Sequence, residues 1–151
     1  MIVVIQVVDQ ASVSIFGKLK ETERKIDKGL VVFLGVSRLD SEVDVNKLIK
    51  KIIKLRVFPD DNKKMNLDVK TIGGEVLLIS QFTLFGNVKK CNRPDFFAAA
   101  DKELAVKLYD LFTVKLTEAG LPVKTGYFGE HMKIDSNLNG PVTIIMESDK
   151  I

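Results

Sequence analysis

Short apolar runs, rich in β-branched residues, recur along this chain and constrain its fold more than any other feature. Most are shorter than an ordinary buried helix and are bounded by Gly, Asn, Asp or Pro, a pattern typical of strands. The expected strands cover residues 2–8, 13–16, 30–36, 75–84, 132–136 and 142–147. A chain with this many strands favours a sheet or barrel over a helix bundle.

Two longer stretches have apolar residues at helical spacing. The first follows Asp40 or Ser41, either of which can cap a helix, and the second follows Asp101 and stops at Gly120 and Pro122. The apolar positions are Val45, Leu48, Ile49, Ile52 and Ile53 in the first, and Leu104, Ala105, Leu108, Leu111, Phe112 and Leu116 in the second. We therefore expect an α/β fold, a mixed, largely antiparallel sheet or barrel with two main helices on one side, in three layers (β/β/α).

The length of 151 residues, with 46% hydrophobic and 28% charged residues, predicts a single domain over residues 1–151. No apolar stretch approaches the ~20 residues of a membrane helix, and Met1–Ile5 is typical of a strand and not of a signal peptide. The one cysteine, Cys91, excludes an internal disulfide. We expect a soluble, cytoplasmic protein without a membrane partner.

The net charge of +3 is too small for a strong field over the whole protein, so nucleic-acid contacts would need local clusters. One cluster is the loop with Lys89, Lys90 and Arg93. The other is the helical set Lys47, Lys50, Lys51, Lys54 and Arg56. For the helix we favour a solvated polar face, whereas for the loop phosphate contact and simple solvation both stay open.

The segment Ser80-Gln81-Phe82-Thr83 continues the apolar run 76–79 with polar residues, as binding sites at strand ends do. If the strand reaches residue 84, Gln81 and Thr83 project to one face and Ser80 and Phe82 to the other. A serine nucleophile assisted by Gln81 is then disfavoured. Backbone N–H groups at the end of the strand could instead face a developing oxyanion.

A second distinctive segment, residues 137–144, contains Asn139-Gly140-Pro141 ahead of a β-branched run and predicts a turn that feeds a strand. The sequence leaves open whether the Gly140–Pro141 bond is cis. The lone histidine, His131, is interpreted as a surface or strand-end residue and Cys91 as a loop thiol. One histidine and one cysteine cannot make an ordinary zinc site, so we expect neither metal nor cofactor.

The segments 80–86 (SQFTLFG) and 140–144 (GPVTI) resemble the paired signatures of the freestanding D-aminoacyl-tRNA deacylases, and their separation is similar too. The likeness is collinear along the whole chain, which is more specific than one short motif. The other similar segments are 4–6, 11–13, 29–36, 55–58, 64–66, 92–96 and 125–129.

The resemblance implies a deacylase-like fold and a homodimeric, metal-free hydrolase that proofreads translation. It would cleave the ester between a D-amino acid and the 3′-terminal adenosine of tRNA, with Ser80, Gln81, Phe82 and Thr83 as the catalytic segment. A cis Gly140–Pro141 element of one subunit would reach into the site of the other. Its carbonyls would bind the substrate's α-ammonium and exclude an L side chain. Glycine has no side chain to exclude, so glycyl-tRNA is an expected additional substrate.

An aminoacyl ester is already activated, so its hydrolysis needs mainly an oxyanion site and a placed water. We favour backbone N–H groups near Gln81 and Phe82 for the oxyanion, with the ribose 2′-hydroxyl assisting the attack. Thr83 as nucleophile is the alternative, although a threonine hydroxyl needs an adjacent base.

Three residues depart from the family pattern. Val7 stands where relatives have an arginine that braces the Gly-Pro element, Leu138 stands in place of an asparagine, and Cys91 stands where glycine is common. The first two could relax chiral selection. They also favour a rival function, a nucleic-acid-binding relative without turnover that uses Lys89, Lys90 and Arg93 for phosphates. A second rival is a hydrolase of another small ester or amide.

Overall fold

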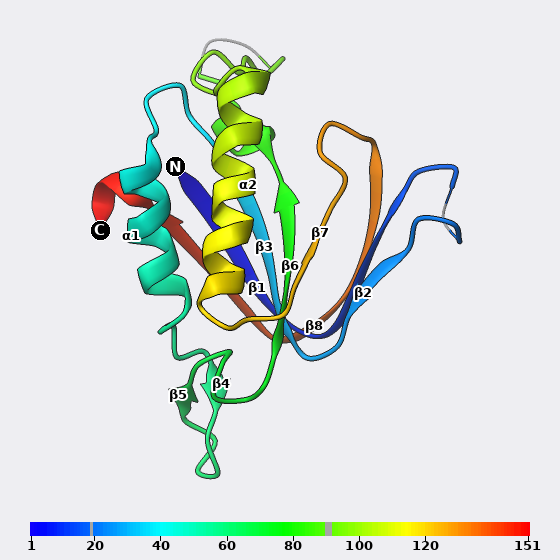
Figure 1. The fold of residues 1–151 in the computed structure, drawn as a ribbon, viewed down its shortest axis with the longest axis vertical. Helices are drawn as coiled ribbons and strands as arrows, with labels where there is room; N and C mark the ends of the chain where they lie inside the picture. The colour runs from blue at the N-terminus through cyan, green and yellow to red at the C-terminus, as the bar shows by residue number, and fades with distance from the viewer. Residues whose placement is uncertain (19, 90–91) are drawn as a thin grey trace.

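The computed structural model of this chain describes residues 1–18, 20–89 and 92–151. Over these residues, one curled sheet carries helices α1 (Glu42–Ile52) and α2 (Lys102–Glu118) on one side (Figure 1). The strands of the sheet are β1 (Ile2–Ile15), β2 (Arg24–Ile26), β3 (Gly29–Gly35), β6 (Glu75–Ser80), β7 (Val123–Thr125) and β8 (Met132–Glu147). A separate ribbon joins β4 (Phe58–Pro59) to β5 (Met65–Leu67), and the 3-10 turns are η1 (Phe82–Phe85) and η2 (Ser148–Lys150).

Strand β1 organises the sheet. It pairs antiparallel with β8 along nearly its whole length and also pairs antiparallel with β3 and with β2. Strand β6 then adds parallel to β3, and β7 adds parallel to β6. The predicted mixed α/β architecture, largely antiparallel with two helices, is confirmed.

Two predicted strand breaks are wrong. Residues 2–8 and 13–15 of the predicted segments belong to the one strand β1, which ends one residue before the predicted end at residue 16. Segments 132–136 and 142–147 belong to the one strand β8. The β1–β8 register shifts between Gln6 and Val8 and again between Val8 and Gln10. Irregularities of this kind let a long paired strand absorb polar and glycine residues without ending, because the neighbouring hydrogen bonds hold both sides together.

The predicted strand 75–84 is also too long, because β6 ends at Ser80. The Gln81 N–H still donates to the Leu34 carbonyl at 2.8 Å, but β3 itself ends at Gly35. With no neighbouring strand left to pair with, the chain turns into η1. The expected alternation of side chains across residues 80–84 therefore does not occur.

Apolar side chains pack on both faces of β3 and β6. Leu30, Val32 and Leu78 belong to the core under the helices, whereas Val31 and Leu77 belong to the core inside the curl of the sheet. Strands covered on both faces read as near-continuous apolar runs, which is why these two were visible in the sequence.

Both helices begin at the predicted caps. The Ser41 side chain accepts a hydrogen bond from the Val43 N–H, and Asp44 completes a capping box. The Asp101 side chain accepts from the Leu104 N–H at 2.9 Å. These local bonds satisfy N–H groups that a helix leaves unpaired at its start, so each helix is positioned by its own sequence.

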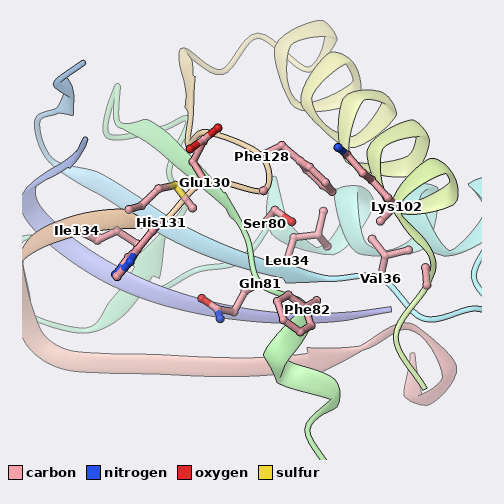
Figure 2. A pocket seen from close by; sticks show the side chains of 14 residues that line it. Leu34, Val36, Ser80, Gln81, Phe82, Lys102, Phe128, Glu130, His131 and Ile134 are labelled. Atoms are coloured by element: carbon pink, nitrogen blue, oxygen red, sulfur yellow. The ribbon is translucent and has the colours of Figure 1, made fainter. Parts of the chain in front are cut away.

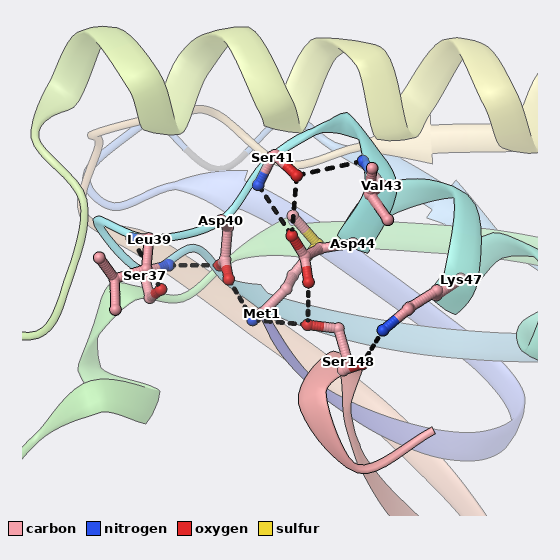
Figure 3. Close-up of polar contacts among 9 residues, drawn as sticks. All are labelled: Met1, Ser37, Leu39, Asp40, Ser41, Val43, Asp44, Lys47 and Ser148. Carbon is pink, nitrogen blue, oxygen red and sulfur yellow. Dashed lines mark hydrogen bonds and ion pairs between the residues drawn. The ribbon is translucent and has the colours of Figure 1, made fainter.

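A buried polar cluster ties the start of β1 to α1 and η2 (Figure 3). The α-ammonium of Met1 donates to Asp40 at 2.5 Å and to the Ser148 hydroxyl at 3.0 Å. Ser148 in turn donates to Asp44 at 2.8 Å, and its carbonyl accepts from Lys47 Nζ at 3.1 Å. Asp40, the other predicted cap candidate, thus serves as the counter-ion of the ammonium and not as the cap.

Candidate functional site

A cavity of about 570 Å³ opens where β6 ends. Its walls come from the end of β3, from the start of α2 and from the loop between β7 and β8 (Figure 2). Most of the lining is apolar, with Ser80, Gln81, Lys102, Glu130 and His131 as the polar exceptions. An apolar hollow with a few converging polar groups is the usual form of a small-ligand site.

Three of the four predicted catalytic residues, Ser80, Gln81 and Phe82, line this cavity together. The prediction that alternation would separate them is wrong, because the strand ends at Ser80. Thr83 is not among the lining residues. Its hydroxyl accepts a hydrogen bond from the Gln81 side-chain amide, and an amide N–H donor is not a base that could activate a nucleophile.

The backbone N–H groups available at this turn are shifted by one residue from the predicted pair, Gln81 and Phe82. The Gln81 N–H is occupied by the Leu34 carbonyl, so it cannot hold an oxyanion. Over the described residues, the N–H groups of Phe82 and Thr83 donate to no acceptor, as is usual in the first turn of a helical segment. The Leu84 N–H is taken by the Gln81 carbonyl at 3.3 Å. The free donors are therefore those of Phe82 and Thr83.

Arg24 holds the loop that forms the opposite wall. Its Nη1 donates to the carbonyls of Thr125 at 2.8 Å and Gly126 at 3.2 Å, and its guanidinium lies 3.9 Å from the centre of the Tyr127 ring. The Tyr127 hydroxyl donates to the Thr22 carbonyl at 2.7 Å. These contacts fix the start of the loop at the mouth of the sheet curl.

Tyr109 of α2 contacts the same loop from the helix side of the sheet. Its hydroxyl donates to the Leu78 carbonyl at 2.8 Å, and its ring meets the Phe128 ring edge-on with centroids 5.6 Å apart. Burial raises the pKa of Tyr109. The phenol therefore stays protonated and remains a hydrogen-bond donor across the whole physiological range.

His131 lies in the cavity wall, which sequence reasoning did not anticipate. It is exposed and stands directly before β8, as predicted, yet it lines the same cavity as Gln81. Its ring stacks on that of Phe16, with centroids 4.8 Å apart and 14° between the planes. Lys102 and Glu130 were likewise missed. No spacing rule signals them, because only the curl of the sheet brings the β7–β8 loop and the start of α2 to the end of β6.

The Gly140–Pro141 element lies elsewhere on the chain. The bond is cis, Gly140 has φ +123°, and both residues are exposed. They lie on β8, next to Val7 of the neighbouring strand β1. Ser80 lies on β6, where it pairs with Leu34 of β3. Three strand spacings and about four residues along the strands separate them, or roughly 20 Å. Within one chain the two predicted halves of the site do not meet.

Val7, which replaces the expected arginine, is buried in the core under the helices. A different side-chain contact reaches the Gly140–Pro141 element. Asn139 Nδ2 donates to Asp9 Oδ1 at 2.8 Å and so ties β8 to β1 next to Gly140. This chain therefore has a hydrogen bond at the element where relatives are expected to use an arginine.

The predicted basic loop follows η1 directly. A bridge between Asn87 and Asp95 closes it, with backbone hydrogen bonds of 2.9 and 3.0 Å. Lys89 and Arg93 are exposed on it. The other two residues of interest, Lys90 and Cys91, lie outside the described residues, so their predicted roles stay predictions.

Across the described ranges, no group of three or more His, Cys, Asp or Glu side chains is placed to hold a metal ion. No helix in the same part of the chain has the length and apolarity needed to cross a membrane.

Comparison with known proteins identifies the family. The family model described as D-Tyr-tRNA(Tyr) deacylase matches residues 4–147. The chain is 51% identical over 148 residues to the D-aminoacyl-tRNA deacylase of Persephonella marina, covering 98% of both, and 48% identical over 149 residues to that of Flavobacterium psychrophilum, covering 98% of this chain and 97% of that protein.

Two solved structures share the fold. The c-Myc DNA Unwinding Element Binding Protein is 37% identical with a TM-score of 0.88, over 97% of this chain and 98% of that one. A probable eukaryotic D-amino acid tRNA deacylase is 16% identical with a TM-score of 0.79, over 96% of this chain and 97% of that one. The family expected from the sequence is confirmed: the chain belongs to the D-Tyr-tRNA(Tyr) deacylase family.

Proposed function

We propose that this protein hydrolyses the ester bond of D-aminoacyl-tRNA and releases the free D-amino acid and tRNA. The observation that carries the proposal is the end of β6, where Ser80, Gln81 and Phe82 line one cavity beside two free backbone donors. The relatives from Persephonella marina and Flavobacterium psychrophilum, both named D-aminoacyl-tRNA deacylase, support this reaction and its enzyme class, a hydrolase that acts on aminoacyl-tRNA.

The proposed chemistry uses main-chain groups. The N–H groups of Phe82 and Thr83 would receive the carbonyl oxygen of the ester as it becomes an oxyanion, and one such donor can contribute ~10²–10³ in rate. The ribose 2′-hydroxyl next to the ester assists the attack of water. Thr83 as nucleophile is disfavoured, because its hydroxyl accepts a hydrogen bond from the Gln81 side-chain amide, which is not a base.

The proposed active form is a homodimer, because one chain holds the Gly140–Pro141 element roughly 20 Å from its own cavity. The sheet face opposite the helices supports this state. There Val4 pairs with Phe33 on one side and with Ile145 on the other, and Ile145 is 64% exposed. A row of apolar side chains across three strands is a surface that a second copy would cover.

In this dimer the Gly140 and Pro141 carbonyls would bind the α-ammonium and leave no space for an L side chain. This chiral filter rests on the family resemblance. Glycyl-tRNA, which carries no side chain, is then a further substrate. The cytoplasm, where charged tRNA is used, is the proposed location.

The test is deacylation of matched D- and L-tyrosyl-tRNA, with glycyl-tRNA alongside. We expect hydrolysis of the D ester and of glycyl-tRNA and little of the L ester. Absence of hydrolysis with all three would refute the function, and equal D and L rates would refute the filter.

Mixing two inactive variants tests the shared site. Phe82→Pro damages the cavity of its own subunit, whereas Pro141→Ala damages the element that the partner receives. A dimer containing one of each has one intact site, so random exchange should restore about a quarter of wild-type activity. No recovery in exchanged, dimeric samples would refute a site shared between subunits.

The rival function is nucleic-acid binding without turnover. It is favoured by the similarity to the c-Myc DNA Unwinding Element Binding Protein. RNA or DNA binding with steep salt dependence and no deacylation of any ester would select it.

A further inference from the structure

We propose that the second half of α1 and the turn after it bind the phosphate backbone of the tRNA acceptor arm. The surface consists of Lys47, Lys50, Lys51, Lys54 and Arg56, which we name the α1 basic hollow. The inference rests on the proposed function, because the tRNA is the substrate of that function. It adds a binding surface away from the cavity.

The five cations surround one concavity of about 550 Å³, whose remaining lining is Leu55 and Ile151. All five side chains are exposed. Residues 47–56 contain no acidic residue. A solvated helix face, the interpretation that the sequence favours, explains the exposure but not the gathering of one sign of charge around a hollow.

No carboxylate of the described residues forms an ion pair with the cations of the hollow. Within the described ranges, none of the five forms an ion pair, and Lys47 Nζ donates only to the Ser148 carbonyl. Other surface lysines are paired, as Lys115 is with Glu118 and Lys133 with Asp135. A phosphate that binds the hollow therefore does not have to displace an internal counter-ion.

The hollow lies within reach of a tRNA whose 3′ end is in the cavity. The Ala100 N–H donates to the Val36 carbonyl, and both residues line the cavity. Helix α1 starts six residues after Val36, at Glu42. In Figure 1 the two helices run side by side away from that end. From the cap of α1 to Lys54 the chain advances about 20 Å.

A nucleic-acid duplex carries one phosphate charge per ~1.7 Å of its axis, so about 20 Å of it presents on the order of ten phosphates. This charge complements the hollow. Lysine contacts to phosphates carry no sequence information, which suits an enzyme that must accept many tRNAs. These two properties favour tRNA over an acidic protein as the occupant.

The test compares two double variants that remove the same charge. Lys50→Gln with Lys54→Gln removes two cations from the hollow. Lys25→Gln with Lys124→Gln removes two exposed lysines from β2 and β7 and serves as the control. Unfolding midpoints of both variants should match that of the wild type, because all four side chains are exposed.

Binding of uncharged tRNA and KM for D-tyrosyl-tRNA are measured at 50 and 200 mM salt. Two lost phosphate contacts lower the slope of log affinity against log salt by about 1.8. Between these salt concentrations the wild type and the control should therefore weaken about tenfold more than the hollow variant. The hollow variant should keep its kcat and its rate on the D-tyrosyl ester of free adenosine.

Equal salt slopes for the two double variants would overturn the inference, as would a loss of activity on the adenosine ester. Failure of the wild type to hydrolyse either ester would refute the proposed function instead. Binding of uncharged tRNA separates the two failures, because it reports on the hollow whether or not hydrolysis occurs.

Discussion

Replacing Phe82 with proline removes one proposed oxyanion donor while changing little else of the backbone. The Phe82 N–H donates to no acceptor among the described residues, so no internal hydrogen bond is lost. Proline fits the first position of a helical turn. The preceding residue, Gln81, has φ −142° and ψ 78°, outside the α region that a following proline disfavours.

The expected loss in kcat is ~10²–10³, or about 2.7–4 kcal/mol of transition-state stabilisation. Phe82→Ala is the matched control, because it keeps the N–H and removes the same ring. That ring is 56% exposed and meets Phe96 edge-on at 5.0 Å, so its loss should mainly affect KM and stability. The assay is single-turnover deacylation of D-tyrosyl-tRNA, which reports the chemical step directly.

The decisive quantity is the ratio of the two variants' single-turnover rates. If Phe82→Pro reacts within about threefold of Phe82→Ala and unfolds at the same temperature, the Phe82 N–H does not stabilise the oxyanion.

Three further outcomes are expected. Thr83→Ala should keep most of its deacylase activity, and a rate loss above about 10⁴ would instead establish a nucleophile. Tyr109→Phe should lower the free energy of unfolding by about 1 kcal/mol, or about 2–4 °C, because the Leu78 carbonyl keeps a second donor; urea and thermal melts measure this. Burial raises the pKa of Asp44, but hydrogen bonds, first that from Ser148, outweigh it and lower the pKa. Asp44 thus stabilises the fold above its unfolded pKa, and this contribution disappears as pH falls through the lower folded value, so Asp44→Asn should flatten the acid limb of a stability–pH profile.

The sequence by itself determined the features that depend on neighbouring residues. Ser41 and Asp101 cap their helices through bonds made within the first turn, so both helices start where predicted. The runs in β3 and β6 are apolar because both faces are covered, and that pattern marks them as strands. The collinear motifs likewise identified the family.

Tertiary structure alone decided how the site is assembled. Strand β6 stops at Ser80 because its neighbour β3 ends. The two strands are distant in sequence, so the local sequence of neither one predicts where their pairing ends. The same turn occupies the Gln81 N–H and frees those of Phe82 and Thr83. The curl of the sheet brings His131 to the cavity, whereas the β1–β8 pairing holds Gly140 far from it. Long-range hydrogen bonding sets these positions, and no local pattern encodes it.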